Sequence, residues 1–176
     1  MPTLENLKYP IGRFIPPPII TPSQLQQWIT DLATFPQQLI EITTTLTETQ
    51  LELCYRKDGW NIRQVIHHLA DSHINAYTRF HLTLTEDRPI IRPYFEDRWA
   101  ELPDGKTGDI QLSINMLTSI HQRLVFLLGK LNPIDFERTY IHPDANQEFT
   151  MGYLTGNYAW HGQHHLAHIK IALGQL

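Results

Sequence analysis

Residues 60–73 read WNIRQVIHHLADSH and lead into a segment that is predicted to be a helix from about residue 61 to 85. Asn61 stands directly before the first apolar residue and is a suitable N-cap. Apolar residues then recur at the spacing of one helix face: Ile62, Val65, Ile66, Leu69, Ala76, Tyr77 and Phe80. The segment therefore predicts one long amphipathic helix with a buried face.

Three further segments show the same periodicity, at about 21–46, 109–131 and 151–173. Pro36 lies inside the first of them and is expected to kink or split it. Gly174 follows the last and is a plausible stop. The chain shows no βαβ alternation, although a small hairpin fits within 136–150. The pattern predicts an all-α, antiparallel four-helix bundle that forms a single domain over residues 1–176.

Two segments outside these helices are rich in proline. Residues 1–20 include Pro16, Pro17 and Pro18 and are predicted to form an extended arm rather than a helix. Residues 86–108 contain three prolines and two glycines and read as a long ordered loop, anchored by aromatic residues. Connections of this length usually shape a binding site or an interface.

Composition narrows the classes of function. The chain has 176 residues, is 41% hydrophobic and carries a formal net charge of −4, as is typical of a globular protein that does not bind nucleic acid. No apolar run is long enough to span a bilayer, so no membrane partner is expected. The single cysteine, Cys54, and the absence of a signal-peptide pattern lead us to expect a cytoplasmic protein.

Histidine is the commonest metal ligand, and the ten histidines of the chain are clustered. Four lie between 161 and 168, where His161/His165 and His164/His168 have the i,i+4 spacing of neighbours on one helix face. By helical periodicity, His165 lies near the centre of the apolar face and His161 about 50° from it. His164 points about 110° away and is expected to face solvent or to support the ligands. His161 and His165 are therefore the candidate metal ligands.

The helix at 61–85 offers a third ligand. His67 lies opposite the apolar face and is expected to be exposed or bonded to the loop. His68 lies at the edge of that face and His73 near its middle, so periodicity alone favours His73. Asp71 either orients a ligand ring or is an exposed charge. His121 and His142, elsewhere in the chain, have no partner at ligand spacing and are assigned no role.

The segment 60–73, together with WHGQHHLAH at 160–168, resembles the DinB/YfiT-like superfamily and, within it, the YfiT-type metal-dependent hydrolases. The YPIG segment at 9–12 and the RKDGW turn at 56–60 extend the resemblance over nearly the whole chain, with RDGGW as the usual form of that turn. The resemblance implies one divalent metal bound by His68, His161 and His165, and so selects His68 over His73. It also implies a homodimer.

Three neutral imidazoles leave coordination positions for water or substrate. Zinc, with nickel as the alternative, can lower the pKa of bound water to about 7 and supply a nucleophile. No H-E-x-x-H motif is present, so the general base and other catalytic residues stay unassigned.

The leading hypothesis is a metal-dependent hydrolase that acts on a small molecule. One alternative is a low-molecular-weight thiol S-transferase that uses the same cation, because a metal readily ionises a bound thiol. A second alternative is a non-enzymatic, metal-stabilised module that binds a small molecule. The sequence does not identify the substrate.

Overall fold

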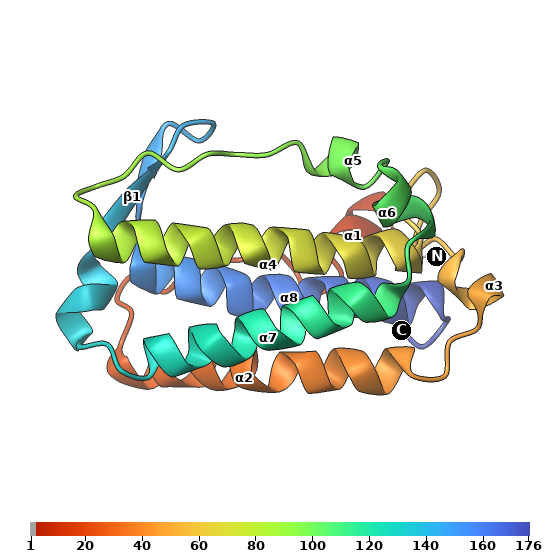
Figure 1. Cartoon of the computed structure of the whole chain (residues 1–176), viewed down its shortest axis with the longest axis horizontal. Helices are drawn as coiled ribbons and strands as arrows, with labels where there is room; N and C mark the ends of the chain where they lie inside the picture. Colours follow the sequence, from red (N-terminus) through yellow and green to blue (C-terminus); the bar gives the residue numbers. More distant parts are fainter. Residues whose placement is uncertain (1–2) are drawn as a thin grey trace.

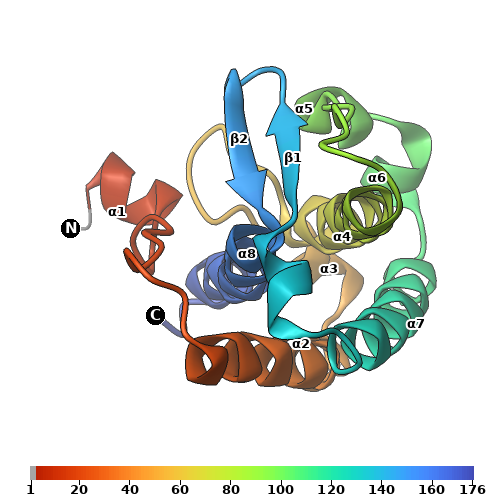
Figure 2. The same cartoon turned by 90° about the vertical axis from the view of Figure 1, so that its left-hand side faces the viewer.

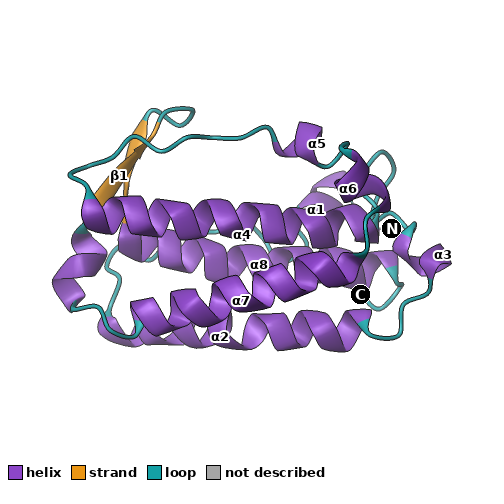
Figure 3. Cartoon of the chain, viewed as in Figure 1, coloured by secondary structure: helices purple, strands orange, loops and turns teal. Residues whose placement is uncertain are grey.

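The computed structural model describes residues 3–176 and consists of four long helices with short elements around them (Figures 1 and 3). The long helices are α2 (Pro22–Thr43), α4 (Ile62–Thr85), α7 (Ile110–Leu128) and α8 (Met151–Ala172). The all-α four-helix bundle is thereby confirmed. The short elements are α1 (Leu4–Lys8), α3 (Glu48–Leu51), α5 (Glu96–Trp99), α6 (Pro103–Thr107), a 3₁₀ helix (Pro133–Glu137), β1 (Thr139–His142) and β2 (Gln147–Thr150).

Polar side chains set the beginnings of the long helices. Asn61 accepts a hydrogen bond from the backbone N–H of Gln64, whose side chain accepts one from the N–H of Asn61, which makes a complete capping box. Thr150 caps α8 in the simpler way, and Gly174 ends that helix with φ +68°. The predicted boundaries of α4 and α8 are therefore close to the observed ones.

The helix α2 runs as one element through Pro36, so of the two predicted effects, a kink or a split, the split is wrong. Phe35 and Leu39, on either side of the proline, are almost fully buried in the bundle. Apolar packing at these positions holds the helix together across the backbone hydrogen bond that proline cannot make.

The helices are not all antiparallel to their neighbours. Figure 1 shows α2 and α8 running in one direction and α4 and α7 in the other. The main helix contacts join α4 to α7, α2 to α8, α2 to α7 and α4 to α8, so two of these four pairs are parallel (Figure 2). The prediction of an antiparallel arrangement is corrected here. The reason is the segment 86–109, which runs back along α4 and lets α7 start at the same end of the bundle.

The arm and the long loop contain short helices that their proline-rich sequences did not predict. Residues 4–8 form α1, which corrects the expectation that the whole arm is extended, while residues 1–2 lie outside the described residues. Thr3 caps α1 at Asn6, and this local hydrogen bond starts the helix before the first internal proline. The loop includes α5 and α6, and the predicted hairpin forms with Tyr140 opposite Phe149.

The apolar core has two parts along the bundle axis. One contains Trp28, Phe80, Leu124 and Leu154 at the hairpin end, and the other contains Leu39, Leu69, Leu117 and Leu166 at the opposite end. Buried histidines from three of the helices lie at the middle of the bundle. Among residues 3–176, none of the helices combines the length and the hydropathy that a membrane span requires.

Candidate metal centre

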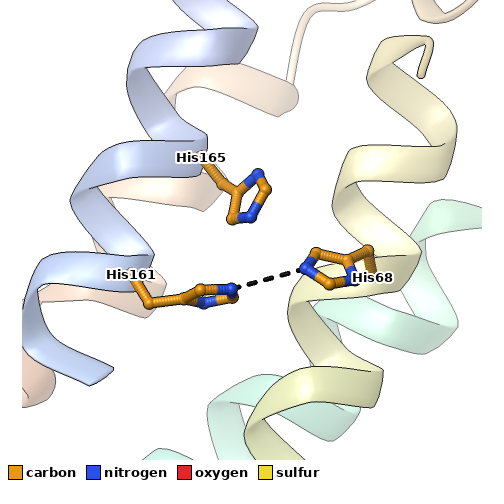
Figure 4. A group of neighbouring side chains, drawn as sticks. All are labelled: His68, His161 and His165. Atoms are coloured by element: carbon orange, nitrogen blue, oxygen red, sulfur yellow. Dashed lines mark hydrogen bonds between the residues drawn. The ribbon is translucent and has the colours of Figure 1, made fainter. Parts of the chain in front are cut away.

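The structure brings together the three histidines that the family resemblance selected. His68 comes from α4, and His161 and His165 lie one turn apart on α8 (Figure 4). The Nε2 atoms of His68 and His161 are 3.4 Å apart, and one ligand nitrogen from each ring lies within 4.8 Å of the others. The i,i+4 spacing on α8 and the packing of α4 against it produce this convergence.

The spacing of these nitrogens fits a metal ion. Two nitrogens that bind one tetrahedral zinc ion at about 2.0–2.1 Å are about 3.3–3.4 Å apart, which matches the His68–His161 separation of 3.4 Å. Imidazole nitrogen also suits nickel. The donor set is therefore suited to one divalent cation, without selecting between these metals.

Burial keeps the three rings neutral at neutral pH. It lowers the pKa of His68 to about 4, with His168 adding a smaller effect. Burial, followed by the neighbouring histidines, also holds the pKa of His161 and of His165 well below the usual value. Neutral imidazoles offer a lone pair without first losing a proton, as metal binding requires.

A chain of hydrogen bonds fixes which nitrogen of His161 carries its proton. The carbonyl oxygen of Leu32 can only accept, so the Nδ1–H of His121 donates to it over 2.6 Å. The Nε2 of His121 then accepts from the Nδ1–H of His73 over 2.8 Å. The Nε2 of His73 in turn accepts from the Nδ1–H of His161 over 3.2 Å. The lone pair of His161 is therefore on Nε2, the atom nearest His68.

His165 is fixed in the same way from the opposite side. The Nε2–H of His168 donates to the carbonyl oxygens of Leu7 and Lys8, at 3.1 and 3.3 Å. Its Nδ1 is then an acceptor, and the Nδ1 of His165 lies 3.3 Å from it as the donor. The Nε2 of His165 is left as the free nitrogen, and Figure 4 shows this ring pointing toward the other two.

A second trio, His164, His165 and His168, also has nitrogens within 4.8 Å of one another. Both nitrogens of His168 are already engaged, one by backbone carbonyls and the other by His165. Binding a metal there would break these bonds. In the first trio the only such contact between ligand nitrogens is the 3.4 Å approach of His68 to His161, and none of the three rings is bonded to a backbone carbonyl within residues 3–176, so this trio is the better candidate.

Two of the remaining histidines, His164 and His67, are more buried than their angular positions on the helices suggested. His164 is buried, so of its two expected positions the solvent-facing one is wrong, because Trp160 stacks on it at 4.5 Å and Tyr9 of the arm lies beside it. Helical periodicity reports the bundle core and does not reveal a face that the arm covers. His67 is also buried and is bonded to the Gly108 carbonyl at the end of the loop, as one of its two predicted roles required.

His73, which periodicity alone favoured as the third ligand, instead bonds to the Nδ1 of the candidate ligand His161. Asp71 makes no side-chain hydrogen bond to a candidate ligand within residues 3–176, and burial raises its pKa to about 6. His121 was assigned no role because its partner, His73, is on another helix and no spacing within one helix could reveal it.

A cavity of about 460 Å³ opens beside the three histidines. Its wall also includes polar groups to which the sequence assigned no role, from α4, the loop, the hairpin and α8: Ser72, Arg79, Tyr94, His142 and Tyr158. Trp60 lines the same cavity, with its ring 4.6 Å from that of His68. The trio therefore faces a cavity whose wall is partly polar and partly aromatic.

Comparison with known proteins relates this geometry to a family. The family model of the DinB superfamily matches residues 31–169. A Bacillus pumilus protein named "Putative metal-dependent hydrolase" is 48% identical over 166 residues, which are 94% of each chain. "Putative metal-dependent hydrolase YfiT" of Bacillus subtilis is 45% identical over 167 residues, covering 95% of this chain and 94% of that one.

The solved structure of YfiT from Bacillus subtilis superposes with a TM-score of 0.94, at 44% identity and with 97% of both chains covered. That structure is described as a probable metal-dependent hydrolase with an unusual four-helix bundle topology. The similarity in sequence and in fold thus extends over nearly the whole chain, and the chain belongs to the DinB superfamily.

Proposed function

We propose that the protein is a metal-dependent hydrolase that acts on a small molecule, with one divalent cation bound by His68, His161 and His165. The observation that carries the proposal is the convergence of three neutral imidazoles on the wall of an open cavity. The names of the relatives from Bacillus pumilus and Bacillus subtilis support the same class of reaction.

A divalent cation held by His68, His161 and His165 would act as a Lewis acid that can polarise an electrophile and lower the pKa of water. The protein residues hold the ligand rings in one tautomer and confine the substrate. His73 and His168 keep protons on the Nδ1 atoms of the two α8 ligands, and Trp60 forms an aromatic part of the cavity wall beside His68. The three side chains leave room for a substrate in a four-coordinate site.

Metal stoichiometry tests the site. We expect about one zinc or nickel ion per chain in the wild type, measured by mass spectrometry after metal loading and gel filtration. His68→Ala, His161→Ala and His165→Ala should each lose most of it. His81→Ala is the matched control, because among residues 3–176 the His81 ring bonds only to the Tyr77 carbonyl of its own helix. His164→Ala should retain the metal, whereas its loss there would favour the second trio. Full retention in the first three variants would refute the site.

Activity measurements separate the candidate reactions. Hydrolysis of a panel of small esters and amides by the metal-loaded protein, without added thiol, supports the hydrolase. Turnover of electrophiles only with an added low-molecular-weight thiol would instead identify a thiol S-transferase. Metal binding without turnover in either assay would favour the binding module. The homodimer and the cytoplasmic location stay predictions, and sedimentation analysis checks the first of them.

A further inference from the structure

The cavity beside the three histidines extends from them toward the hairpin end of the bundle. His68 and His161 lie in its wall together with Arg79 of α4 and His142 of β1. Arg79 is eleven residues beyond His68 on α4, so their backbones are about 16 Å apart along the helix. The cavity therefore has a metal-binding end and a second end with different chemistry.

Arg79 is a half-buried cation without a carboxylate partner. Its Nη1 donates to the hydroxyl of Tyr158 over 3.2 Å, and its Nε is buried with no hydrogen-bond partner. No Asp or Glu of residues 3–176 forms an ion pair with it within 4.0 Å. A guanidinium in this position gains most from a ligand that brings negatively charged oxygen.

A second nitrogen without a partner lies in the wall formed by the hairpin. The Nδ1 of His142 is buried and unbonded in the described structure. Of the four such side-chain atoms among residues 3–176, three belong to residues that line this cavity: Arg79, His142 and His164. Buried polar groups are nearly always satisfied, so their concentration in one cavity indicates a polar ligand.

Two carboxylates, Glu96 and Asp144, also line the cavity, but both residues are exposed. Solvent and salt therefore screen them, whereas the guanidinium of Arg79 is partly removed from water. The net effect at the inner wall is an unpaired positive charge beside neutral hydrogen-bonding groups.

We propose that this cavity binds a small molecule with an anionic oxygen group, a carboxylate or a phosphate, held by Arg79 and His142 while its reacting bond lies at the three histidines. This inference rests on the proposed function for the reacting end only. The anion subsite is made of side chains that are separate from the candidate metal ligands.

The Arg79 Nε–H signal provides a direct test by two-dimensional ¹H–¹⁵N NMR of the full chain. Its disappearance in Arg79→Gln identifies the signal. Acetate and phosphate are titrated separately at constant ionic strength, first without metal and then with one equivalent of Zn²⁺. We expect a saturable shift of this signal with one or both anions, and the stronger binder distinguishes carboxylate from phosphate. Sodium chloride and acetamide should produce no such shift.

Binding should weaken by about tenfold or more in Arg79→Gln, as loss of a charge-assisted hydrogen bond predicts. In that variant the affinity is followed by the backbone signals of Tyr158 and His142. Arg123→Gln removes the same charge from the exposed face of α7 and should leave the affinity unchanged. Thermal unfolding establishes that both variants fold.

Absence of a saturable shift with either anion, or equal affinity in Arg79→Gln and wild type, would overturn the anion subsite. Because the first titration contains no metal, such a result is independent of the metal stoichiometry that tests the proposed function. If the wild type bound an anion but bound no metal, the proposed hydrolase would be overturned and the anion subsite would still stand.

Discussion

The Nδ1 of His73 lies 2.8 Å from the Nε2 of His121, and this contact completes a hydrogen-bonded path through all four long helices. The path begins at the Leu32 carbonyl of α2, passes through His121 of α7 and His73 of α4, and ends at His161 of α8. Phe35 packs over both central rings, with centroids 5.9 and 5.5 Å away. The ring orientation at the candidate metal centre is thus linked to the packing of the whole bundle.

His73→Leu removes the acceptor for the Nδ1–H of His161 and should weaken metal binding about 10–100-fold, which is the usual cost of losing a partner that orients a ligand. His73→Gln should retain affinity within a few fold, because the amide both accepts from His161 and donates to His121. Competition titration with a chromophoric chelator measures the affinity of each variant for zinc.

Tautomer state separates this effect from simple loss of stability. In the metal-free wild type, long-range ¹H–¹⁵N correlation spectra should show His161 and His165 protonated on Nδ1. His73→Leu should release His161 from this tautomer and leave His165 unchanged, because His165 depends on His168. His81→Leu is the control on the same helix. An Nε2–H tautomer of His161 in the wild type would contradict the inferred direction of the bonds.

Sequence periodicity predicted the elements well because each long helix carries its own signal of apolar spacing and caps. The spacing of Ile62, Val65 and Leu69 predicts α4 without information from any other helix. The parallel pairing of α4 with α7 depends on the path of the loop 86–109, which local patterns do not encode. Periodicity therefore gave the helices and left their directions undetermined.

The candidate site was predictable only in part, for a related reason. The i,i+4 spacing on one helix predicts His161 and His165 as ligands, whereas the choice of His68 over His73 needed the family resemblance. His73 lies deeper in the bundle than His68, and its ring nitrogen bonds to His161. On α4 the position near the middle of the apolar face thus belongs to the residue that supports a ligand, and the ligand itself lies at the edge of that face. Arg79 and His142 line one cavity but come from distant segments of the chain. The local sequence around each of them therefore does not indicate that they share a site.

His168 connects the N-terminal arm to the candidate metal centre. His168→Phe should keep the stacking on Tyr55, whose ring is 4.0 Å away, but lose the bonds to the Leu7 and Lys8 carbonyls. We expect faster hydrogen exchange in residues 3–14 and weaker zinc binding through the loss of the His165 partner. Hydrogen exchange with mass spectrometry measures the first effect, and chelator competition the second.

Trp160→Phe provides the comparison for that variant. It removes the bond from the indole Nε1 to the Gly12 carbonyl and leaves the His168–His165 contact in place. Exchange in the arm should increase while zinc affinity stays near the wild-type value. Equal losses of affinity in both variants would show that the arm, rather than the His168 nitrogen, maintains the site.

The buried histidines should make the metal-free protein sensitive to acid. Burial lowers the pKa of His121 to about 4 and is also the main cause that lowers the pKa of His168 to about 4. In the unfolded chain these histidines bind protons near pH 6.5, whereas in the folded chain they bind them only near pH 4. Their contribution to the free energy of unfolding is therefore fully present above pH 6.5 and is lost as the pH decreases toward 4. Asp71 works in the opposite direction, because burial raises its pKa to about 6.

Each buried histidine contributes a slope of up to about 1.4 kcal/mol per pH unit within this window, so several histidines should outweigh the single aspartate. Denaturant unfolding of the metal-free protein between pH 8 and 4.5 should show a flat region and then a fall that begins near pH 6.5. His121→Gln keeps both hydrogen bonds without a titrating ring and should make the fall shallower, whereas His81→Gln should not. If stability stayed constant down to pH 5, or if His121→Gln had the wild-type slope, uptake of protons by the buried histidines would not be what destabilises the protein in acid.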